Sequence, residues 1–341
     1  MNFDSLLTEV ESSLGTINHE FFRQKNLTLT GSSGLIGTYL LAYFYWLNQL
    51  GYDVKLTSIS RSEPPEYLAK LIEQAGMTHL TLDLTDFDQY QYLPSADIVI
   101  HGAGYAQPTL FMANPAATLT INVAATLALL KAVDRNGTFI FLSSSEIYCG
   151  ALAEICTEDT CGTTTPYHPR SSYIEGKRAG EAACAAYRTK GIRTISLRLG
   201  DIYGPGTRKH DQRALNSFIE QALVTGQINL RDQGTAMRTY SYVTDAVESI
   251  LNILTQGQHP VYNVGGPTFT SIKELAHLIG KLTSTPVNLP IINNQIAGSP
   301  PVLNIDMTRL NFEFNKSNHL SLLDGLTRTI AWQQQMYSKV Q

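Results

Sequence analysis

The chain has 341 residues, which at roughly 150 residues per domain suggests about two structural units. Hydrophobic residues make up 43% of the chain and charged residues 16%, a composition that buries a large core and excludes disordered, collagen-like and disulfide-scaffold proteins. The net charge is −4 and the basic residues are scattered, so no nucleic-acid partner is expected. No apolar run approaches the roughly 18–20 residues that span a bilayer, so no membrane association is expected.

The N-terminal segment and the cysteines bear on location and on metal binding. The first residues, MNFDSLLTEVESS, contain no basic segment followed by an apolar one, so no secretory signal is expected. The cysteines form no C-x-x-C pair, which predicts reduced thiols and no metal site. These cysteines are Cys149, Cys156, Cys161 and Cys184. We therefore expect a cytoplasmic protein.

Residues 1–26 have a helical pattern and are predicted to form an N-terminal extension outside the main architecture. Short β-rich runs then alternate with longer segments of helical period. The predicted strands are 27–30, 54–59, 80–82, 97–101, 138–142 and 194–197, and the helices between them include 37–50, 115–133 and 173–189. This alternation predicts right-handed crossovers and a parallel sheet covered on both faces.

Beyond Gly204 the alternation breaks up. The elements predicted there are a helix at 215–225, a strand at 260–264, a helix capped by Ser271 and a last helix at 322–337. This tail is too small to bury its apolar face alone, so we expect it to pack on the carboxyl edge of the sheet. The predicted fold class is α/β, with a Rossmann-type doubly wound parallel sheet and a smaller C-terminal α/β substrate-binding domain. The expected boundaries are 27–203 with return segments near 236–265 for the first domain, and 204–235 with 266–341 for the second.

A glycine-rich turn, GSSGLIG at 31–37, joins the first predicted strand to an apolar helix. This order places a pyrophosphate at the helix N-terminus, where unpaired N–H groups and the helix dipole favour negative charge. Gly31 allows the tight turn, Gly34 allows close approach of the backbone, and Gly37 allows close packing of helix on strand. The turn predicts a dinucleotide cofactor, and the alternative is an ordinary loop.

The residues at the end of the second and third strands bear on the type of cofactor. An acidic residue normally ends the second strand and holds the adenosine ribose, but this chain has Ser60-Arg61-Ser62. Arg61 and its neighbouring hydroxyls suit a 2′-phosphate, which favours NADP over NAD, and the alternative is a solvated loop arginine. Asp83, after the third strand, is a candidate for the adenine edge or for a helix cap.

Tyr173 and Lys177 open a predicted helix and are four residues apart, so their side chains share one helical face. A lysine ammonium beside a phenol, together with an oxidised nicotinamide, lowers the pKa of the phenol and makes it a proton acceptor for alcohol oxidation. The segment Ser143-Ser144-Ser145-Glu146 follows an apolar strand, where open α/β sheets bind ligands. The alternatives are a surface helix and an ordinary polar turn.

These motifs together resemble the extended short-chain dehydrogenase/reductases, the NAD-dependent epimerase/dehydratase family whose members remodel nucleotide sugars. The segment RSSYIEGKR at 170–178 is similar to R-S-x-Y-x-E-G-K-R of the UDP-glucuronate decarboxylases. In the same way RTYSYV at 238–243 resembles R-x-F-x-Y-V, and YNVG at 262–265 resembles Y-N-I-G. The resemblance covers roughly residues 26–335.

The resemblance implies a lyase that works through a 4-keto sugar. Tyr173, assisted by Lys177, removes the proton from O4 while hydride leaves C4, and CO2 is then lost from a nucleotide-linked uronate such as UDP-glucuronate. Hydrogen bonds from Tyr173 and Ser144 stabilise the enolate. Glu146 and Arg238 act near C5 and C6, and Ser145 stands where dTDP-glucose dehydratases carry an aspartate. The hydride returns to C4, so NAD or NADP is tightly bound and recycled.

The resemblance also implies the binding residues. The cofactor contacts are Gly31, Gly34, Leu35, Ile36, Gly37, Arg61, Asp83, Leu84, Ala103, Gly104, Asn122, Tyr173 and Lys177. The substrate contacts are Tyr105, Asp201, Arg213 and Arg238. Asp201 replaces an asparagine of the family near the sugar diphosphate. The alanine-rich stretch 182–186 gives a slim helix, the region that the family pairs in a homodimer.

Two other functions fit the same residues. A nucleotide-sugar 4,6-dehydratase or epimerase shares all of them except the handling of the carboxylate. A non-catalytic NAD(P)-binding sensor keeps the fold, although family members that lose catalysis usually lose the tyrosine or the lysine.

Overall fold

The computed structural model describes residues 3–14, 17–291 and 298–338. Its centre is a seven-stranded sheet of order β10-β6-β5-β4-β1-β2-β3, in which all neighbours are parallel. The strands are β1 (Asn26–Thr30), β2 (Lys55–Ser60), β3 (Thr78–Thr81), β4 (Ala96–His101), β5 (Val133–Ser144), β6 (Arg193–Leu199) and β10 (Val261–Val264). The strand order reverses between β1 and β4, which confirms the predicted doubly wound α/β fold.

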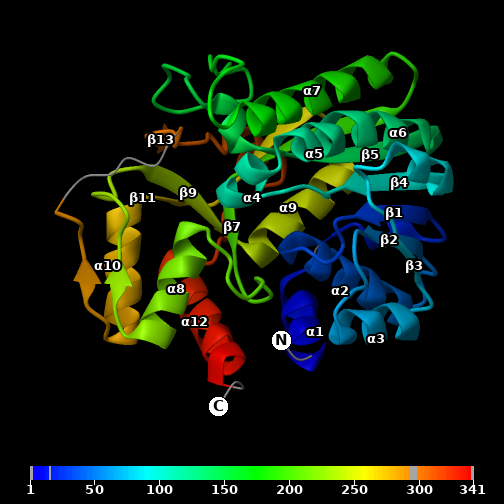
Figure 1. Cartoon of the computed structure of the whole chain (residues 1–341). Coiled ribbons are helices and arrows are strands. Elements are labelled where there is room, and N and C mark those ends of the chain that lie inside the picture. Colours follow the sequence, from blue (N-terminus) through cyan, green and yellow to red (C-terminus); the bar gives the residue numbers. More distant parts are fainter. Residues whose placement is uncertain (1–2, 15–16, 292–297, 339–341) are drawn as a thin grey trace.

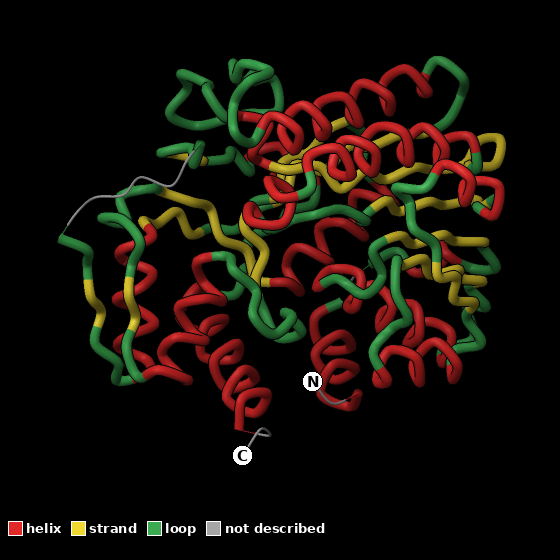
Figure 2. The backbone as a smooth tube through the Cα atoms, in the orientation of Figure 1, coloured by secondary structure: helices red, strands yellow, loops and turns green. Residues whose placement is uncertain are grey.

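Helices cover both faces of this sheet (Figures 1 and 2). One layer holds α2 (Leu35–Gln49), α3 (Glu66–Gln74) and α9 (Val243–Gln256), and the other holds α5 (Pro115–Thr120), α6 (Thr126–Lys131) and α7 (Ser171–Arg188). Alternate residues of each strand face the two layers: Ile140 packs into the first core and Phe139 into the second. The helix expected at 115–133 is divided, because a π-helical turn (Ile121–Ala125) separates α5 from α6.

The N-terminal helix α1 (Phe3–Ser13) was expected outside the main architecture, but it is packed into it. Leu6, Val10 and Leu14 are fully buried in the core that α2 and α9 share. The carboxylate of Glu9 accepts hydrogen bonds from the Tyr39 hydroxyl of α2, at 2.7 Å, and from the Tyr242 hydroxyl of β9. The expectation was wrong because a helical period shows which face is apolar and does not show what covers it.

The C-terminal part forms a second, smaller sheet. Strand β9 (Met237–Tyr242) pairs with β7 (Asp201–Tyr203), with β13 (Val302–Leu303) and, antiparallel, with β11 (Thr268–Ser271). Short strands β8 (Ile228–Asn229) and β12 (Val287–Asn288) form a separate pair. The helices of this part are α8 (Ala214–Thr225), α10 (Ile272–Thr283), α11 (Thr308–Glu313) and α12 (Leu322–Ser338). Ser271 caps α10 through a capping box with Glu274, as predicted.

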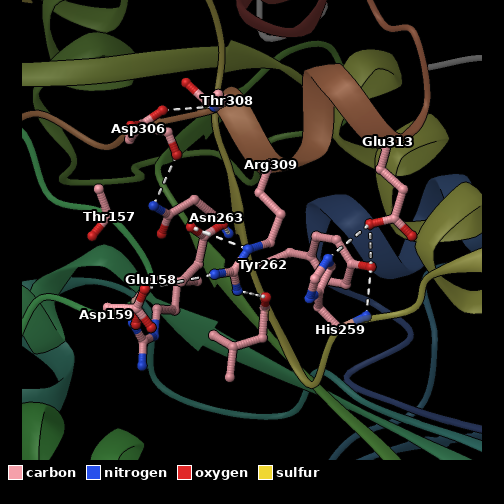
Figure 3. A network of polar contacts seen from close by, with 12 residues as sticks. Thr157, Glu158, Asp159, His259, Tyr262, Asn263, Asp306, Thr308, Arg309 and Glu313 are labelled. Atoms are coloured by element: carbon pink, nitrogen blue, oxygen red, sulfur yellow. Dashed lines mark hydrogen bonds and ion pairs between the residues drawn. The ribbon is translucent and has the colours of Figure 1, made fainter.

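A polar network anchors the long loop between the 3-10 turn Ser145–Tyr148 and α7 (Figure 3). At its centre is the buried side chain of Asn263 in β10, whose Nδ2 donates to the carbonyls of Cys156 and Asp306, both at 2.9 Å. The backbone N–H of Asn263 donates to Glu158 at 2.9 Å. The network thus ties the first part of this loop to β10 and to the segment that precedes α11.

The remaining elements are the short helix α4 (Pro108–Ala113) and two 3-10 turns, His19–Phe22 and Phe87–Tyr92. Helix α4 follows β4 and lies between the large sheet and the second sheet (Figure 1). In the described part of the chain, no helix is long and apolar enough to cross a membrane.

Candidate active site

A cavity of about 560 Å³ lies at the carboxyl ends of β1, β2, β4 and β5, which is where open parallel sheets bind ligands. A second cavity of about 250 Å³ adjoins it, and both are walled by Glu146, Asp201, Arg213 and Arg238. The larger cavity is lined by these predicted residues: Gly31, Gly34, Leu35, Ile36, Gly37, Arg61, Asp83, Leu84, Ala103, Gly104, Tyr105, Ser144, Ser145, Tyr173 and Lys177.

The geometry of the glycine turn fits a dinucleotide. Gly31 has a φ of +72°, and a Cβ there would lie 2.5 Å from the backbone of Gly102 at the end of β4. A Cβ on Gly37 would lie 2.4 Å from the Gly31 carbonyl. Gly34 precedes α2 and supplies no side-chain cap, so the first N–H groups of the helix, which have no intrahelical partner, lie uncapped at the cavity wall. Such a terminus is a ready site for a pyrophosphate.

Arg61 and Tyr105 meet at the rim of the larger cavity. The Arg61 guanidinium donates to the Tyr105 hydroxyl at 2.6 Å and lies 5.5 Å from the centre of the Tyr105 ring. Tyr105, which was expected to contact substrate, is therefore held beside Arg61, which was expected to bind the 2′-phosphate of the cofactor. Asp83 accepts hydrogen bonds from the N–H and the hydroxyl of Thr85, at 2.9 and 2.7 Å, so one of its oxygens serves a turn.

Asn122 is the one predicted cofactor residue that does not line the cavity. Its side chain is fully buried in the π-helical turn, where Nδ2 donates to the Thr118 carbonyl at 2.8 Å. A Cβ on Gly176 of α7 would lie 3.2 Å from this side chain. The structure thus places Asn122 against the back of α7, the helix that carries Tyr173.

Lys177 points from α7 to the central strand β5. Its ammonium donates to the carbonyl of Leu142 at 2.7 Å and lies 5.9 Å from the centre of the Tyr173 ring. Burial lowers the pKa of Lys177 to about 7, while Glu181 acts in the opposite direction. Lys177 is therefore anchored on the sheet.

Tyr173 is held by a hydroxyl and by an aromatic ring. Burial, followed by the charge of Glu146, raises the pKa of its phenol, and the hydrogen bond with Ser144 opposes that shift. On the other side, the Phe111 ring of α4 is stacked on the Tyr173 ring, with centroids 4.4 Å apart. A proton acceptor in this position needs a bound cation or a polarised partner before it ionises near neutral pH.

Glu146 lies at the end of β5, in the 3-10 turn that follows Ser144. The Ser144 hydroxyl accepts a hydrogen bond from the Glu146 N–H at 3.2 Å, and Ser145 is buried beside it. The Glu146 carboxylate forms an ion pair with Arg170. Burial raises the pKa of this carboxyl, and Arg170 and Arg238 act against that shift.

Three of the four predicted substrate residues, Asp201, Arg213 and Arg238, share the walls of both cavities. Arg213 is bound in a fork to Asp211, with Nε–Oδ1 at 3.0 Å and Nη2–Oδ2 at 2.7 Å. Arg238 donates to the Met237 carbonyl at 2.7 Å and to the Ser299 hydroxyl at 3.0 Å. Burial raises the pKa of Asp201, and the charge of Arg238 is the largest opposing influence.

Three residues at this site were missed by sequence reasoning. Arg170 bonds to Glu146, and Phe111 stacks on Tyr173. Arg208 donates to the Ser33 hydroxyl of the glycine turn at 2.8 Å. Arg170 was visible as the first residue of the RSSYIEGKR segment, which was used only for the resemblance. Nothing in the sequence pairs Phe111 with Tyr173 or Arg208 with Ser33.

The described residues contain no group of three or more His, Cys, Asp or Glu side chains arranged to hold a metal ion. His101, at the end of β4, is fully buried, and both of its ring nitrogens have hydrogen-bond partners. Nε2 donates to the Ile121 carbonyl, and Nδ1 is hydrogen-bonded to the Thr30 hydroxyl. Burial lowers its pKa to about 3, so the ring is neutral and packed.

A sequence model of the NAD dependent epimerase/dehydratase family matches residues 27–265, which span the large sheet and the site. The chain belongs to this family. The match begins at the strand before the glycine turn and ends just after β10, so it includes Tyr173, Lys177, Glu146 and Arg238.

Individual members of the NAD dependent epimerase/dehydratase family show what kinds of enzyme the chain is similar to. It is 29% identical over 280 residues to UDP-glucuronic acid decarboxylase 6 of Arabidopsis thaliana, covering 81% of this chain and 80% of that protein. It is 26% identical over 319 residues to dTDP-4-dehydro-6-deoxy-D-allose reductase of Streptomyces bikiniensis, covering 90% and 96%. Among solved structures, UDP-glucuronic acid 4-epimerase from Bacillus cereus has a TM-score of 0.75 at 22% identity, covering 92% and 100%, which shows the shared fold.

Proposed function

We propose that this protein modifies a nucleotide sugar by transient oxidation at C4, and that its reaction is decarboxylation of a nucleotide-linked uronate such as UDP-glucuronate. One observation carries the proposal: the Tyr173–Ser144 pair and the Glu146 and Arg238 side chains lie on the walls of one continuous cavity system. Relatives that cover most of the chain are UDP-glucuronic acid decarboxylases, and the Bacillus cereus epimerase was solved with UDP-glucuronic acid and NAD.

The glycine turn and the N-terminus of α2 would hold the cofactor. When bound, its nicotinamide supplies the hydride acceptor at C4 and returns the hydride, so the enzyme needs no external oxidant. Arg61 at the end of β2 favours NADP, because its guanidinium suits a 2′-phosphate and the last residue of that strand is Ser60 rather than an acidic residue that holds a ribose diol.

The chain's own residues supply the proton transfers. The Tyr173 phenolate oxygen accepts the proton of the C4 hydroxyl, and Lys177, 5.9 Å from the Tyr173 ring, supplies positive charge on the same helix face. A ketone at C4 makes a C6 carboxylate a β-keto acid, which loses CO2 as the electron pair passes to the C4 oxygen. Hydrogen bonds from Tyr173 and Ser144 stabilise that enolate. C5 then takes up a proton, which Glu146 in its protonated form is placed to deliver and which solvent resupplies to its carboxylate.

Arg238 is the arginine suited to a C6 carboxylate. Arg170 and Arg213 are already paired with Glu146 and Asp211, whereas the Arg238 guanidinium contacts only a carbonyl and a hydroxyl among the described residues. An arginine without a carboxylate partner in a shared cavity wall attracts an anionic substrate group.

A second candidate function rests on Asp201, which lines both cavities with Arg238. When ionised, this carboxylate offsets the charge of Arg238 and repels a uronate. That balance favours a neutral hexose, and the reaction would then be 4,6-dehydration or 4-epimerisation by the same Tyr173 chemistry.

We also propose that the protein is a homodimer formed through α5 and α7. Leu119 and Leu127 on neighbouring helices are 42% and 38% exposed, and the alanines of the 182–186 stretch leave the outer face of α7 slim. Light scattering of the purified protein tests this, with twice the chain mass expected and the chain mass contradicting it.

The function is tested by mass spectrometry of a nucleotide-sugar panel, including UDP-glucuronate, incubated with the protein and either NAD or NADP. Loss of CO2 from a uronate establishes the decarboxylase. Loss of water from a neutral hexose, or a new stereoisomer of unchanged mass, establishes the second candidate. Binding of cofactor without turnover of any member contradicts both and supports a sensor.

A further inference from the structure

The two oxygens of the Glu146 carboxylate have different surroundings. Oε1 accepts a hydrogen bond from Nη1 of Arg170, and the two side chains are 16% and 5% exposed. Oε2 is buried and has no hydrogen-bond partner within the described residues, although Glu146 lines both cavities. Oε1 is therefore held by Arg170, while Oε2 remains free to bond to a group that enters the cavity.

Arg170 lies between Glu146 and Tyr173, the two residues to which the proposed function assigns proton transfers. The residue is 4% exposed, and its carbonyl accepts the N–H groups of Tyr173 and Ile174 at 3.1 and 3.0 Å, which starts α7. Its guanidinium lies 5.7 Å from the centre of the Phe111 ring, and that ring is stacked on Tyr173. A continuous contact thus runs from Glu146 through Arg170 and Phe111 to Tyr173.

We propose that Arg170 is a positioning residue that holds the Glu146 carboxylate by one oxygen and keeps it in register with Tyr173. The proposal deepens the proposed function, on which it rests for the reaction that Glu146 serves. A planar guanidinium fits the role because it is permanently charged and donates in a fixed direction. Removing one partner of a buried pair leaves the other charge uncompensated, so Glu146 depends on Arg170 more than a solvated carboxylate would.

Several charged or titratable groups face Glu146 from the surrounding elements. Arg170 begins α7, Arg238 comes from β9, Asp201 from β7, and Tyr173 and Cys149 also interact with the Glu146 charge. Burial and Asp201 favour the protonated acid, whereas the two arginines favour the carboxylate. Loss of the Arg170 charge therefore moves the balance toward the protonated form of Glu146.

The first test measures the ionisation of Glu146 directly and needs no turnover. The protein is labelled with ¹³C in the glutamate carboxyl carbons, and the Glu146 resonance is assigned by its absence in Glu146→Gln. In Arg170→Gln its titration midpoint is expected to rise by about 1 to 3 pH units. An unchanged midpoint in Arg170→Gln overturns the proposal.

Two further variants separate positioning from general structural damage. Arg198→Gln breaks another largely buried pair, Arg198–Glu181, which lies off both cavity walls, and it is expected to leave the Glu146 midpoint unmoved. Arg170→Lys restores the positive charge without the planar guanidinium. In this variant the titration midpoint of Glu146 is expected to return toward its wild-type value. A shift in Arg198→Gln as large as in Arg170→Gln overturns the assignment to Arg170.

The second test uses turnover of whichever panel member the wild type converts. Arg170→Lys is expected to lower kcat by at least about tenfold while changing KM much less, because a misplaced group costs transition-state stabilisation first. An unchanged kcat in Arg170→Lys overturns the positioning role, and this variant decides the point if Arg170→Gln does not fold. Absence of wild-type turnover refutes the proposed function instead, and the titration still decides whether Arg170 holds the Glu146 charge.

Discussion

The ring of Phe111 lies parallel to the ring of Tyr173, with an interplanar angle of 10° and centroids 4.4 Å apart. This stack fixes the plane of the phenol, while Ser144 contacts its hydroxyl. Because a phenylalanine at 173 keeps the ring and the stack, Tyr173→Phe removes only the hydroxyl that we propose transfers the proton. We predict that turnover falls by at least about 10²–10⁴-fold.

The same variant is expected to bind cofactor nearly as well as the wild type, which fluorescence titration with NADH and NADPH will show. Tyr187→Phe is the matched control, since Tyr187 is also a buried tyrosine of α7 but does not line the cavities, and it should keep its turnover. Undiminished activity in Tyr173→Phe would refute proton transfer by Tyr173.

Arg61→Ala is predicted to weaken binding of NADPH more than binding of NADH. A bidentate arginine–phosphate contact is charge-assisted, and only NADPH carries the 2′-phosphate. Isothermal titration of both cofactors against each variant measures the difference. Arg23→Ala serves as control, because Arg23 also stacks on a tyrosine, Tyr52, but stands away from the cavity. Equal losses for the two cofactors would remove Arg61 as the phosphate-binding residue.

Lys177→Met is predicted to be more stable than the wild type near neutral pH, by a margin that shrinks as the pH rises. Burial lowers the pKa of Lys177 to about 7 in the folded chain, against about 10.4 in an unfolded one. Between these values the unfolded state binds more protons, so this lysine makes the wild type gain stability with increasing pH. Thermal denaturation from pH 7 to 10 measures the margin, and a margin independent of pH contradicts the prediction.

Glu9→Ala tests the unexpected packing of α1. The hydroxyls of Tyr39 and Tyr242 both donate to Glu9, and both tyrosines are fully buried. Leaving two buried donors without an acceptor should lower the free energy of unfolding by about 1–3 kcal/mol for each hydroxyl. Urea denaturation gives the value, with Glu11→Ala, an exposed carboxylate of the same helix, as control. A loss no larger than the control's means that the apolar side chains of α1 hold it without help from Glu9.

The large sheet and the glycine turn were predictable because each depends on local sequence. Every strand there is bounded by turn residues, and the turn at 31–37 carries its conformation in its glycines. The second sheet was not predictable, since β13 has two residues and pairs with β9, more than 60 positions earlier. Short strands have too few residues to show a period of two.

The same distinction holds within the site. Tyr173 and Lys177 could be predicted as neighbours because one helix carries both at fixed spacing. The Arg170–Glu146 pair was missed, because the two residues are 24 positions apart and are joined by an irregular loop anchored to β10. Asn122 was expected at the cofactor, but its side chain turns back toward Thr118 and α7. The spacing of residues along the sequence predicts which of them share a helix or strand. Which helices and strands come into contact depends on the conformation of the loops between them.

In the proposed reaction, C4 of the sugar is oxidised and then reduced within one active site. The most direct measurement is the incubation of UDP-glucuronate deuterated at C4 with the protein and NADP or NAD, followed by mass spectrometry of the product. We predict loss of CO2 with the deuterium retained, because the hydride that leaves C4 returns to it, and we predict no such product from Tyr173→Phe. Product that has lost its deuterium to solvent, or turnover that survives in Tyr173→Phe, would contradict it.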